Sequence, residues 1–329
     1  MPTSGEVTLL WALRSPCSFA CPHCYFGTIA EHRQVPHAQT GELSHLSGRD
    51  LPARVLTDFA ATLPGSRVRR VIIAGGEPLD WPATLEVVAL AKEAGCQVVI
   101  ATNGVPLTRA PVIERLLALG VDGVSVSLDS ADPEINDRLR PSRTPGRFGF
   151  HDVLAGIRAL RDARGAGSLP RIGIYTVVTR SRPQEITDVA RLAGEAGADY
   201  YVPQPISLEP DHVLFHDLSH TTADVPNVQD QLADLYRTQR GLALPDPSYI
   251  RRFVAAITTQ DSGHVPDCFA GVGLFFVQPD GTVWDCPSSA GSPPPPPPGP
   301  RRRSPEATPG HCSPPAPHTP TAPCSAGTA

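Results

Sequence analysis

Lysine, methionine and aromatic residues are scarce in this chain of 329 residues, and long apolar runs are missing. Lys92 is the only lysine, there is one methionine, and aromatic residues make up 6% of the chain. The formal net charge is −5, so the composition predicts no broad basic surface for nucleic acid or for a membrane. No run approaches the ~20 apolar residues of a membrane span, which argues against an integral membrane protein.

An export signal is also missing from the N-terminus. The stretch MPTSGEVTLLWALRSP has neither a charged start nor a small-residue cleavage site. We therefore expect a cytoplasmic protein, in a compartment where thiols stay reduced. A disulfide framework is consequently a poor first explanation for the eight cysteines. Hydrophobic residues make up 40% of the chain, which is compatible with one large domain or two ordinary ones.

Strand-like and helix-like segments alternate through the first 206 residues. The predicted strands are Glu6–Leu13, Arg70–Ala74, Gln97–Ala101, Gly123–Leu128, Arg171–Val178 and Tyr200–Ile206, and the predicted helices are about 50–63, 82–95, 108–119, 150–164 and 183–196. Most of these strands are continuous apolar runs, which are typical of strands buried on both faces. The alternation predicts an α/β fold with a parallel sheet, either flat and doubly wound or curved into a partial barrel. Both architectures place ligands at the carboxyl ends of the strands.

The pattern changes after Ile206. Residues 224–240 and 246–260 look helical, and Leu274–Val277 and Thr282–Trp284 flank Asp280-Gly281, which is a hairpin signal. The proline-rich stretch 291–329 cannot bury a core, so we expect it to be a disordered tail. This stretch also resembles GC-rich DNA read in a shifted frame, and a native tail and a shifted frame both stay open.

Three cysteines crowd into the segment SPCSFACPHCYFG, directly after the first predicted strand. Cys17, Cys21 and Cys24 have the spacing C-x₃-C-x₂-C, and the segment holds no fourth cysteine. Three thiolates on a 4Fe-4S cluster leave one iron open for a substrate or a cofactor. A zinc site completed by His23 or His32, and cysteines that merely pack, are the alternatives at this point.

Glycines and polar residues stand at the ends of the next three predicted strands. The segments are GGEP at 75–78, TNG at 102–104 and SVSLDS at 125–130. Two glycines let a ligand approach the backbone closely, and the Glu77 carboxylate can accept hydrogen bonds from an ammonium group. An ordinary turn between strand and helix is the alternative for GGEP alone. Together, polar residues at the same end of successive strands predict a single pocket, because a packed core avoids them.

In combination, these motifs resemble those of the radical SAM superfamily. CSFACPHC matches the family's cysteine signature, AGGEP its amino-group-binding motif, and TNG and VSLD its strands on the ribose and carboxylate side. The similarity covers about residues 6–206 and continues more weakly to about 288. The resemblance implies a partial (β/α)6 barrel over 1–220, with the cluster on the loop after the first strand.

The resemblance also implies the chemistry. The cofactors would be a 4Fe-4S cluster and S-adenosyl-L-methionine (SAM), whose amino and carboxylate groups chelate the open iron. An electron from the reduced cluster would cleave the sulfonium bond and give a 5′-deoxyadenosyl radical, which abstracts hydrogen from the substrate. A reductase or a flavodoxin- or ferredoxin-type protein would supply that electron.

Single residues receive roles from the same resemblance. The iron ligands would be Cys17, Cys21 and Cys24, and the SAM-binding residues would be Gly75, Gly76, Glu77, Pro78, Asn103, Ser127, Arg140 and Tyr25. Glu77 and the glycine backbone would hold the amino group, and Arg140 would hold the carboxylate. Asn103 would lie at the ribose, and Ser127 at a ribose or carboxylate oxygen. Arg138 and Arg143, near Arg140, have a solvated basic turn as their alternative.

One departure from the family pattern concerns the residue before the third cysteine. That position is usually aromatic and lies near adenine, but here it is His23. Tyr25 follows the last cysteine and would take part of that role.

Cys268, Gly281 and Cys286 resemble the beginning of the SPASM extension, or of its shorter twitch form, which binds auxiliary clusters. The family pattern begins C-x₉₋₁₅-G-x₄-C, and QPDGTVWDCP resembles the family's sequence here. Cys312 and Cys324 follow at an unfamiliar spacing. The resemblance therefore implies a partial extension over 221–290 and a candidate auxiliary 4Fe-4S cluster at Cys268 and Cys286, although two thiolates alone would leave that cluster under-ligated.

Cys96 and a histidine series lie outside these motifs. Cys96 begins a buried strand, so packing explains it better than metal binding does. His212, His216 and His220 recur every four residues, and on one helix they would share a face as metal ligands do. A polar segment near the barrel mouth, in contact with substrate or water, is the alternative.

Three classes of function follow. The first is a radical SAM enzyme that acts on a ribosomally made peptide, or on a small molecule such as a sugar, nucleoside or aminoglycoside intermediate. The chain begins almost at the first strand, so we expect no N-terminal domain that binds a leader peptide, and this weakens the peptide hypothesis. The second class is a non-catalytic iron–sulfur protein, and the third is a zinc-ribbon protein.

Overall fold

The structure is a computed structural model that describes residues 5–24, 50–180, 185–206, 208, 214–258 and 270–285. The chain divides into two compact units, Met1–Gly291 and Ser292–Ala329, and the whole second unit lies outside the described residues. The predicted tail over 291–329 therefore stays a prediction, and so does the division of 1–290 into a core and an extension.

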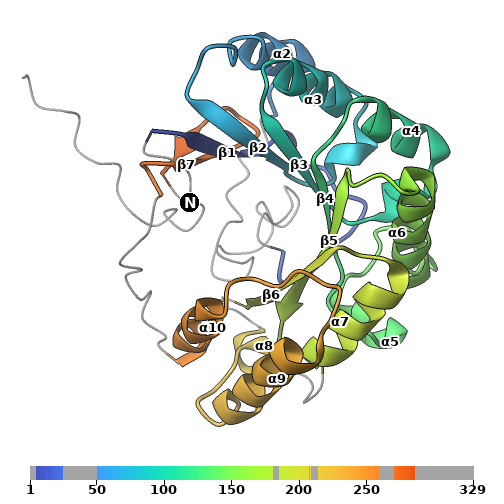
Figure 1. Cartoon of the computed structure of the whole chain (residues 1–329), viewed down its shortest axis with the longest axis vertical. Coiled ribbons are helices and arrows are strands. Elements are labelled where there is room, and N and C mark those ends of the chain that lie inside the picture. The colour runs from blue at the N-terminus through green and yellow to red at the C-terminus, as the bar shows by residue number, and fades with distance from the viewer. Residues whose placement is uncertain are drawn as a thin grey trace, which may run out of the picture. The chain divides into compact units, whose positions relative to one another are not determined.

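Eight strands form one sheet in the order β6-β5-β4-β3-β2-β1-β7-β8. Their bounds are Val7–Ala12 (β1), Val68–Ala74 (β2), Gln97–Thr102 (β3), Gly123–Ser127 (β4), Arg171–Val178 (β5), Tyr200–Pro205 (β6), Leu274–Val277 (β7) and Val283–Trp284 (β8). Every neighbouring pair is parallel except β7 and β8. The sheet curves and carries helices along its outer side (Figure 1). Of the two predicted architectures, the structure therefore shows the curved partial barrel and not the flat sheet.

The described helices are α2 (Ala53–Ala60), α3 (Ala83–Glu93), α4 (Ala110–Ala118), α5 (Pro133–Leu139), α6 (Phe150–Arg164), α7 (Glu185–Ala196), α8 (Phe215–Leu218), α9 (Val225–Thr238) and α10 (Ser248–Thr258), with short 3-10 turns η2 (Pro78–Asp80) and η3 (Val105–Thr108). The two short helices α5 and α8 were not predicted. α5 has a clear start signal, because Asp132 caps it by accepting hydrogen bonds from the backbone of Glu134 and Ile135. No helix of the described residues is long and apolar enough to cross a membrane.

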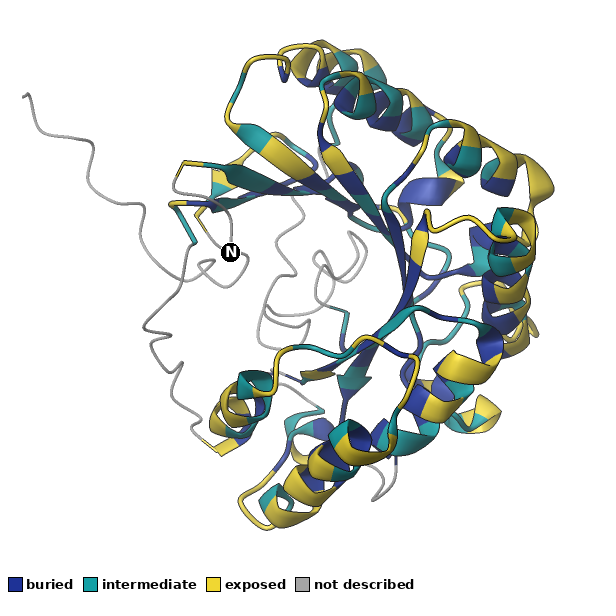
Figure 2. Ribbon diagram, in the orientation of Figure 1, coloured by how far each residue is buried: buried dark blue, intermediate teal, exposed yellow. Residues whose placement is uncertain are grey.

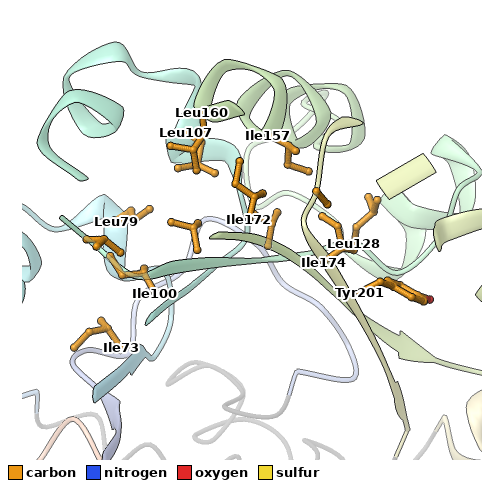
Figure 3. Packing of buried hydrophobic residues seen from close by; sticks show 14 of the residues in the cluster. Ile73, Leu79, Ile100, Leu107, Leu128, Ile157, Leu160, Ile172, Ile174 and Tyr201 are labelled. Carbon is orange, nitrogen blue, oxygen red and sulfur yellow. The ribbon is translucent and has the colours of Figure 1, made fainter. Parts of the chain in front are cut away.

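The core lies between the outer face of the sheet and the covering helices. Ile100 and Ile174 point outward from β3 and β5 and are fully buried. Ile157 and Leu160 of α6 lie over these strands in Figure 3. Figure 2 shows the same arrangement, with buried residues along the sheet and on the inner sides of the helices. Burial of each such side chain stabilises the folded state by about 1.5–3 kcal/mol. The strands whose carboxyl ends carry the site loops are therefore part of a stable core.

The hairpin predicted around Asp280-Gly281 is confirmed. Gln278 donates its backbone N–H to Thr282 at 2.9 Å, and Phe276 pairs with Trp284 across the two strands. The sequence did not predict that this hairpin joins the barrel sheet. β7 runs parallel to β1, with Thr8 opposite Leu274, so the sheet continues past β1.

Candidate functional site

The cysteine loop, residues 13–24, leaves the carboxyl end of β1 and is fastened to the segment after α5. Ala20 donates its backbone N–H to the carbonyl of Pro141 at 2.8 Å, and the Arg143 N–H donates to the carbonyl of Ser18 at 2.9 Å. The Arg143 side chain donates from Nε to the carbonyl of Phe19 at 3.1 Å. Arg143 therefore does more than form a solvated turn, because it holds the loop that carries the cysteines. Arg138, in contrast, is exposed.

Gly75 and Gly76 allow this loop to pass against the end of β2. A Cβ on Gly75 would lie 2.5 Å from the carbonyl oxygen of Arg14, and one on Gly76 would lie 2.0 Å from that of Pro16. Gly75 also has a φ of +130°, which disfavours a side chain. The sequence predicted a close approach of a ligand here, whereas in the structure the backbone of the cysteine loop makes that approach.

Glu77 follows the two glycines and is fully buried. Its side chain connects the end of β2 to the end of β3. Its carboxylate accepts hydrogen bonds from Thr102 Oγ1 at 2.8 Å and from the N–H groups of Asn103 at 2.6 Å and Leu79 at 3.0 Å. Burial raises the pKa of Glu77 to about 7, although these three donors oppose the shift. Pro78 follows as the buried first residue of η2.

The Asn103 side chain reaches the cysteine loop from the end of β3. Its Nδ2 donates to Ser18 Oγ at 3.1 Å and lies 3.9 Å from Cys17 Sγ. The Cys17 sulfur also accepts the N–H of Phe19 at 3.4 Å. Two of the predicted site residues, Asn103 and Cys17, are thus brought together, and the end of β3 contacts the first cysteine of the motif.

A buried cluster of three charged or titratable side chains lies on the other side of the loop. Asp129, which follows β4, accepts hydrogen bonds from Arg140 Nη1 at 2.9 Å and from His23 Nε2 at 3.2 Å. Burial disfavours the charge of both Asp129 and Arg140. Arg140 and the hydrogen bond from His23 nevertheless lower the pKa of Asp129, and Cys21, followed by Asp129, raises that of Arg140. The residue after Arg140, Pro141, accepts the N–H of Ala20 at 2.8 Å, so Arg140 belongs to a segment that contacts the cysteine loop.

As whole residues, Cys17, Cys21 and Cys24 are partly exposed, but the thiol groups of Cys17 and Cys21 are poorly solvated. Burial raises the pKa of Cys17 to about 11, with a further contribution from Glu77. Burial likewise raises the pKa of Cys21 to about 12, against the attraction of Arg140. Thiols of this kind stay protonated unless a metal compensates the thiolate charge.

The remaining predicted residues are placed as follows. Ser127 ends β4 opposite Tyr175 of β5. Ser125 does not join the carboxyl-end pocket, because its hydroxyl is bonded to Tyr200 Oη at 2.8 Å. Cys96 is buried in the core, as predicted. Tyr25, His32, Cys268, Cys286, Cys312 and Cys324 lie outside the described residues.

The two described histidines of the series, His216 and His220, do not share a helix face. α8 ends at Leu218, so the exposed His216 is helical whereas the buried His220 lies beyond the helix. His220 Nε2 contacts the carbonyl of Val178 at 3.1 Å. His212 lies outside the described residues. His216 and His220 therefore do not form the shared helix face that the metal-site hypothesis requires.

The donors of the cysteine loop fit an iron–sulfur cluster with a bound cofactor. Its three cysteines are the thiolate donors that such clusters use, and His23 is not available as a zinc ligand through Nε2, which faces Asp129. The other ring nitrogen, His23 Nδ1, is buried without a hydrogen bond among the described residues, as expected beside a group that binds later. No three histidine, cysteine or acidic side chains of the described chain surround a point where a single metal ion could bind.

Comparison with known proteins agrees with this geometry. The family model of the radical SAM superfamily matches residues 16–200, which is more than half of the chain. The chain belongs to this superfamily. The AdoMet-dependent heme synthase of Methanosarcina barkeri is 30% identical over 301 residues, which cover 86% of this chain and 77% of that protein. The mycofactocin maturase MftC of Mycobacterium tuberculosis is 29% identical over 283 residues, covering 86% of this chain and 65% of the maturase.

Solved structures support the radical SAM fold. Streptococcus suis SuiB has a TM-score of 0.63 at 15% identity, with 88% of this chain and 62% of SuiB covered. The structure of anSMEcpe with bound AdoMet has a TM-score of 0.60 at 16% identity, with 86% and 75% covered. At these identities the comparison shows the fold. With the family match, it makes this chain a radical SAM enzyme, whose cofactors are a 4Fe-4S cluster and SAM.

The structure also reveals site residues that the sequence left without a role. Asp129 is part of the VSLD motif, and Ser18 lies within the cysteine signature, but neither pattern indicates a contact partner. Both contacts join residues more than 80 positions apart, Ser18 with Asn103 and His23 with Asp129, and periodicity carries no information about such pairs.

Proposed function

We propose that this radical SAM enzyme modifies a ribosomally made peptide. Its cluster would be ligated by Cys17, Cys21 and Cys24. When bound, the cluster and SAM supply a 5′-deoxyadenosyl radical, which removes a hydrogen atom from the substrate. The observation that carries this radical chemistry is the cysteine loop, which is fixed by Gly76, Asn103 and Arg143 at the carboxyl ends of the strands.

The residues around this loop have distinct tasks in the proposal. Arg140 binds the carboxylate of SAM, since among the described residues its guanidinium donates only to Asp129. The backbone of Gly75 and Gly76 lies beside the loop and binds the amino group. Glu77 contributes by holding the ends of β2 and β3 together, because its side-chain oxygens already accept three hydrogen bonds. Asn103 binds the ribose side, and Ser127 binds a ribose or carboxylate oxygen. Tyr25, which is outside the described residues, would take part of the aromatic role near the adenine.

The peptide substrate is supported by the similarity to the PqqA peptide cyclase of Ruegeria pomeroyi, 30% identical over 139 residues, and to the mycofactocin maturase, a relative whose name describes maturation. The chain spans 65% of that relative's length, so the substrate is inferred from the shared part alone. The candidate auxiliary cluster at Cys268 and Cys286 belongs to the same proposal. We also propose a cytoplasmic location, where thiols stay reduced, and a reductase or a flavodoxin- or ferredoxin-type electron donor.

A small-molecule substrate is the second candidate. The specific observation in its favour is the heme synthase of M. barkeri, which matches at 30% identity and of which this chain covers 77%. In that case the enzyme would oxidise or rearrange a metabolite instead of a peptide.

Anaerobic reconstitution tests the enzyme itself. We expect protein loaded with iron and sulfide, reduced with dithionite and given SAM, to release 5′-deoxyadenosine. Cys21→Ala should abolish the product and lower the iron content, whereas the matched variant Cys96→Ala should do neither, because Cys96 packs in the core. A Cys21→Ala protein with full iron and full product would refute the assignment of the cluster.

Label transfer separates the two substrate classes. Candidate peptides and candidate metabolites, each fully deuterated, are incubated with the active enzyme, and 5′-deoxyadenosine is analysed by mass spectrometry. Deuterium that appears only with a peptide supports the peptide proposal, and deuterium that appears only with a metabolite supports the second candidate.

A further inference from the structure

Asp129 is a buried carboxylate between the cysteine loop and Arg140, and no role has been assigned to it. It lies two residues after the end of β4 and is 2% exposed. One of its oxygens, Oδ2, accepts hydrogen bonds from Arg140 Nη1 at 2.9 Å and from His23 Nε2 at 3.2 Å. A single buried atom therefore joins the cysteine loop to the residue that ends α5.

Asp129 is itself held at a fixed position. Its other oxygen, Oδ1, accepts the backbone N–H of Val177 in β5 at 2.8 Å. Its own N–H donates to Asn136 Oδ1 in α5 at 3.1 Å. Both partners belong to the sheet and its flanking helix, so the carboxylate cannot rotate without breaking a buried hydrogen bond.

Arg140 has donors left over. Its side chain is 12% exposed, and among the described residues it donates only to Asp129, although a guanidinium has five N–H groups. Arg140 shares its acceptor atom with His23 of the cysteine loop, and the next residue, Pro141, accepts the N–H of Ala20 at 2.8 Å, so the remaining donors are close to that loop. A buried cation with unused donors is suited to an anionic group that binds beside those thiols.

His23 has an acceptor or donor left over as well. An ionised carboxylate only accepts hydrogen bonds, so the ring nitrogen Nε2 carries the proton that faces Asp129. The other nitrogen, Nδ1, is buried and has no hydrogen bond among the described residues. An unmatched polar atom at such a place is costly, which indicates a partner that arrives with the cofactor.

We propose that Asp129 is a positioning residue of the cofactor site, which orients Arg140 and His23 for SAM through one shared carboxylate oxygen. This inference rests on the proposed function, in which SAM and the cluster bind at the cysteine loop. Asp129 touches neither the substrate nor the reacting atoms. Its effect is to keep two side chains, one from the loop and one from the end of α5, in the geometry that binds SAM.

Asp129→Asn is the direct test. The amide has the same shape and its oxygen can still accept the N–H of Val177, but its NH₂ group cannot accept from Arg140 and His23. We expect near-normal iron content and at least tenfold weaker SAM binding, measured by the SAM-induced change in the EPR spectrum of the reduced cluster. We also expect the reduction potential of the cluster to rise, because a negative charge is lost nearby. Unchanged SAM affinity would overturn the proposal.

Asp199→Asn is the matched control. Asp199 accepts hydrogen bonds from Arg164 Nη2 at 3.2 Å and from the N–H of Ile172 at 2.6 Å. It thus makes an arginine pair and a bond to β5, as Asp129 does, but at the amino end of that strand. We expect lower thermal stability with unchanged SAM affinity and potential. If Asp199→Asn weakens SAM binding as much as Asp129→Asn does, the effect is structural and the proposal fails.

If the Asp129→Asn protein does not fold, Asn136→Ala provides a second test of the proposal. It removes one anchor of Asp129 and leaves every charge in place. We expect SAM binding to weaken several-fold while the potential stays constant, and unchanged SAM binding would contradict the inference.

The same measurements separate this inference from the proposed function. Wild-type protein that binds the cluster and SAM without forming 5′-deoxyadenosine refutes the function, while the EPR comparison still decides the role of Asp129. Wild-type protein that assembles no cluster at this loop refutes both.

Discussion

The backbone N–H of Asn103 donates to Glu77 Oε2 at 2.6 Å, between the ends of β3 and β2. Thr102 and Leu79 donate to the other oxygen of the same carboxylate. The segments GGEP and TNG are therefore one hydrogen-bonded unit, although 25 residues of sequence separate Glu77 from Thr102. That unit supports the side of the cysteine loop where Asn103 contacts Ser18.

Glu77→Gln tests this unit. The glutamine NH₂ group cannot accept the N–H of Asn103, so one buried donor loses its partner. We expect the free energy of unfolding to fall by about 1–3 kcal/mol, measured by urea unfolding under anaerobic conditions. The exposed Glu86 of α3 offers a control, because Glu86→Gln should change stability by less than about 0.5 kcal/mol. Equal effects of the two substitutions would contradict the role of Glu77.

The pH dependence of stability gives a second prediction for Glu77. Its pKa in the folded protein, about 7, lies above the ordinary value of 4.5, so the folded state binds more protons than the unfolded state between these values. The stabilisation from this group is complete below about pH 4.5 and is lost as the pH rises through 7. The advantage of wild type over Glu77→Gln should therefore shrink between pH 5 and pH 8. A constant difference across this range would show that Glu77 does not titrate there.

Gly76→Ala should displace the cysteine loop. The new methyl group would lie 2.0 Å from the carbonyl oxygen of Pro16, and a backbone atom cannot move aside as the end of a flexible side chain can. We expect a loss of more than about 2 kcal/mol in stability and a lower iron content after reconstitution. In Gly194→Ala, within α7, the nearest atom is 3.9 Å away, so this control should match or slightly exceed wild-type stability. Full iron in Gly76→Ala would refute the close packing.

Arg143→Gln should loosen the cysteine loop while leaving the barrel intact. It removes the hydrogen bond from Arg143 Nε to the carbonyl of Phe19 but keeps the backbone bond to Ser18. We expect little change in thermal stability and a several-fold faster loss of iron to a chelator. Arg147→Gln breaks only the exposed pair with Asp152 and should lose iron at the wild-type rate. If both variants lost iron to the chelator at the same rate, Arg143 would have no part in holding the cysteine loop.

Phe276→Ala tests whether β7 belongs to the barrel. Phe276 is 1% exposed and packs at 5.7 Å, ring centre to ring centre, against Trp284. If the hairpin is part of the core, the substitution should cost about 3–5 kcal/mol of unfolding free energy. The neighbouring Val283 is exposed, so Val283→Ala should have an effect below about 0.5 kcal/mol. A similarly small effect for Phe276→Ala would mean that the hairpin is only loosely attached.

The amino-acid sequence by itself determined the order of the elements and the family. Apolar runs such as those of β3 and β5 predicted strands whose bounds agree with the structure within one or two residues, because strands buried on both faces must be apolar throughout. The cysteine signature and GGEP are contiguous, so they could be found without knowing any distant contact.

Only the tertiary structure decided what these motifs touch. Gly76 accommodates the backbone of Pro16, Glu77 binds Asn103, and Asp129 pairs with Arg140 and His23. The pairing of β7 with β1 could not be predicted from the sequence either, because strands far apart in the chain pair according to shape and burial in the folded protein. Hydrophobic periodicity indicates which face of a helix or strand is buried. The residues that pack against that face are determined by the tertiary structure.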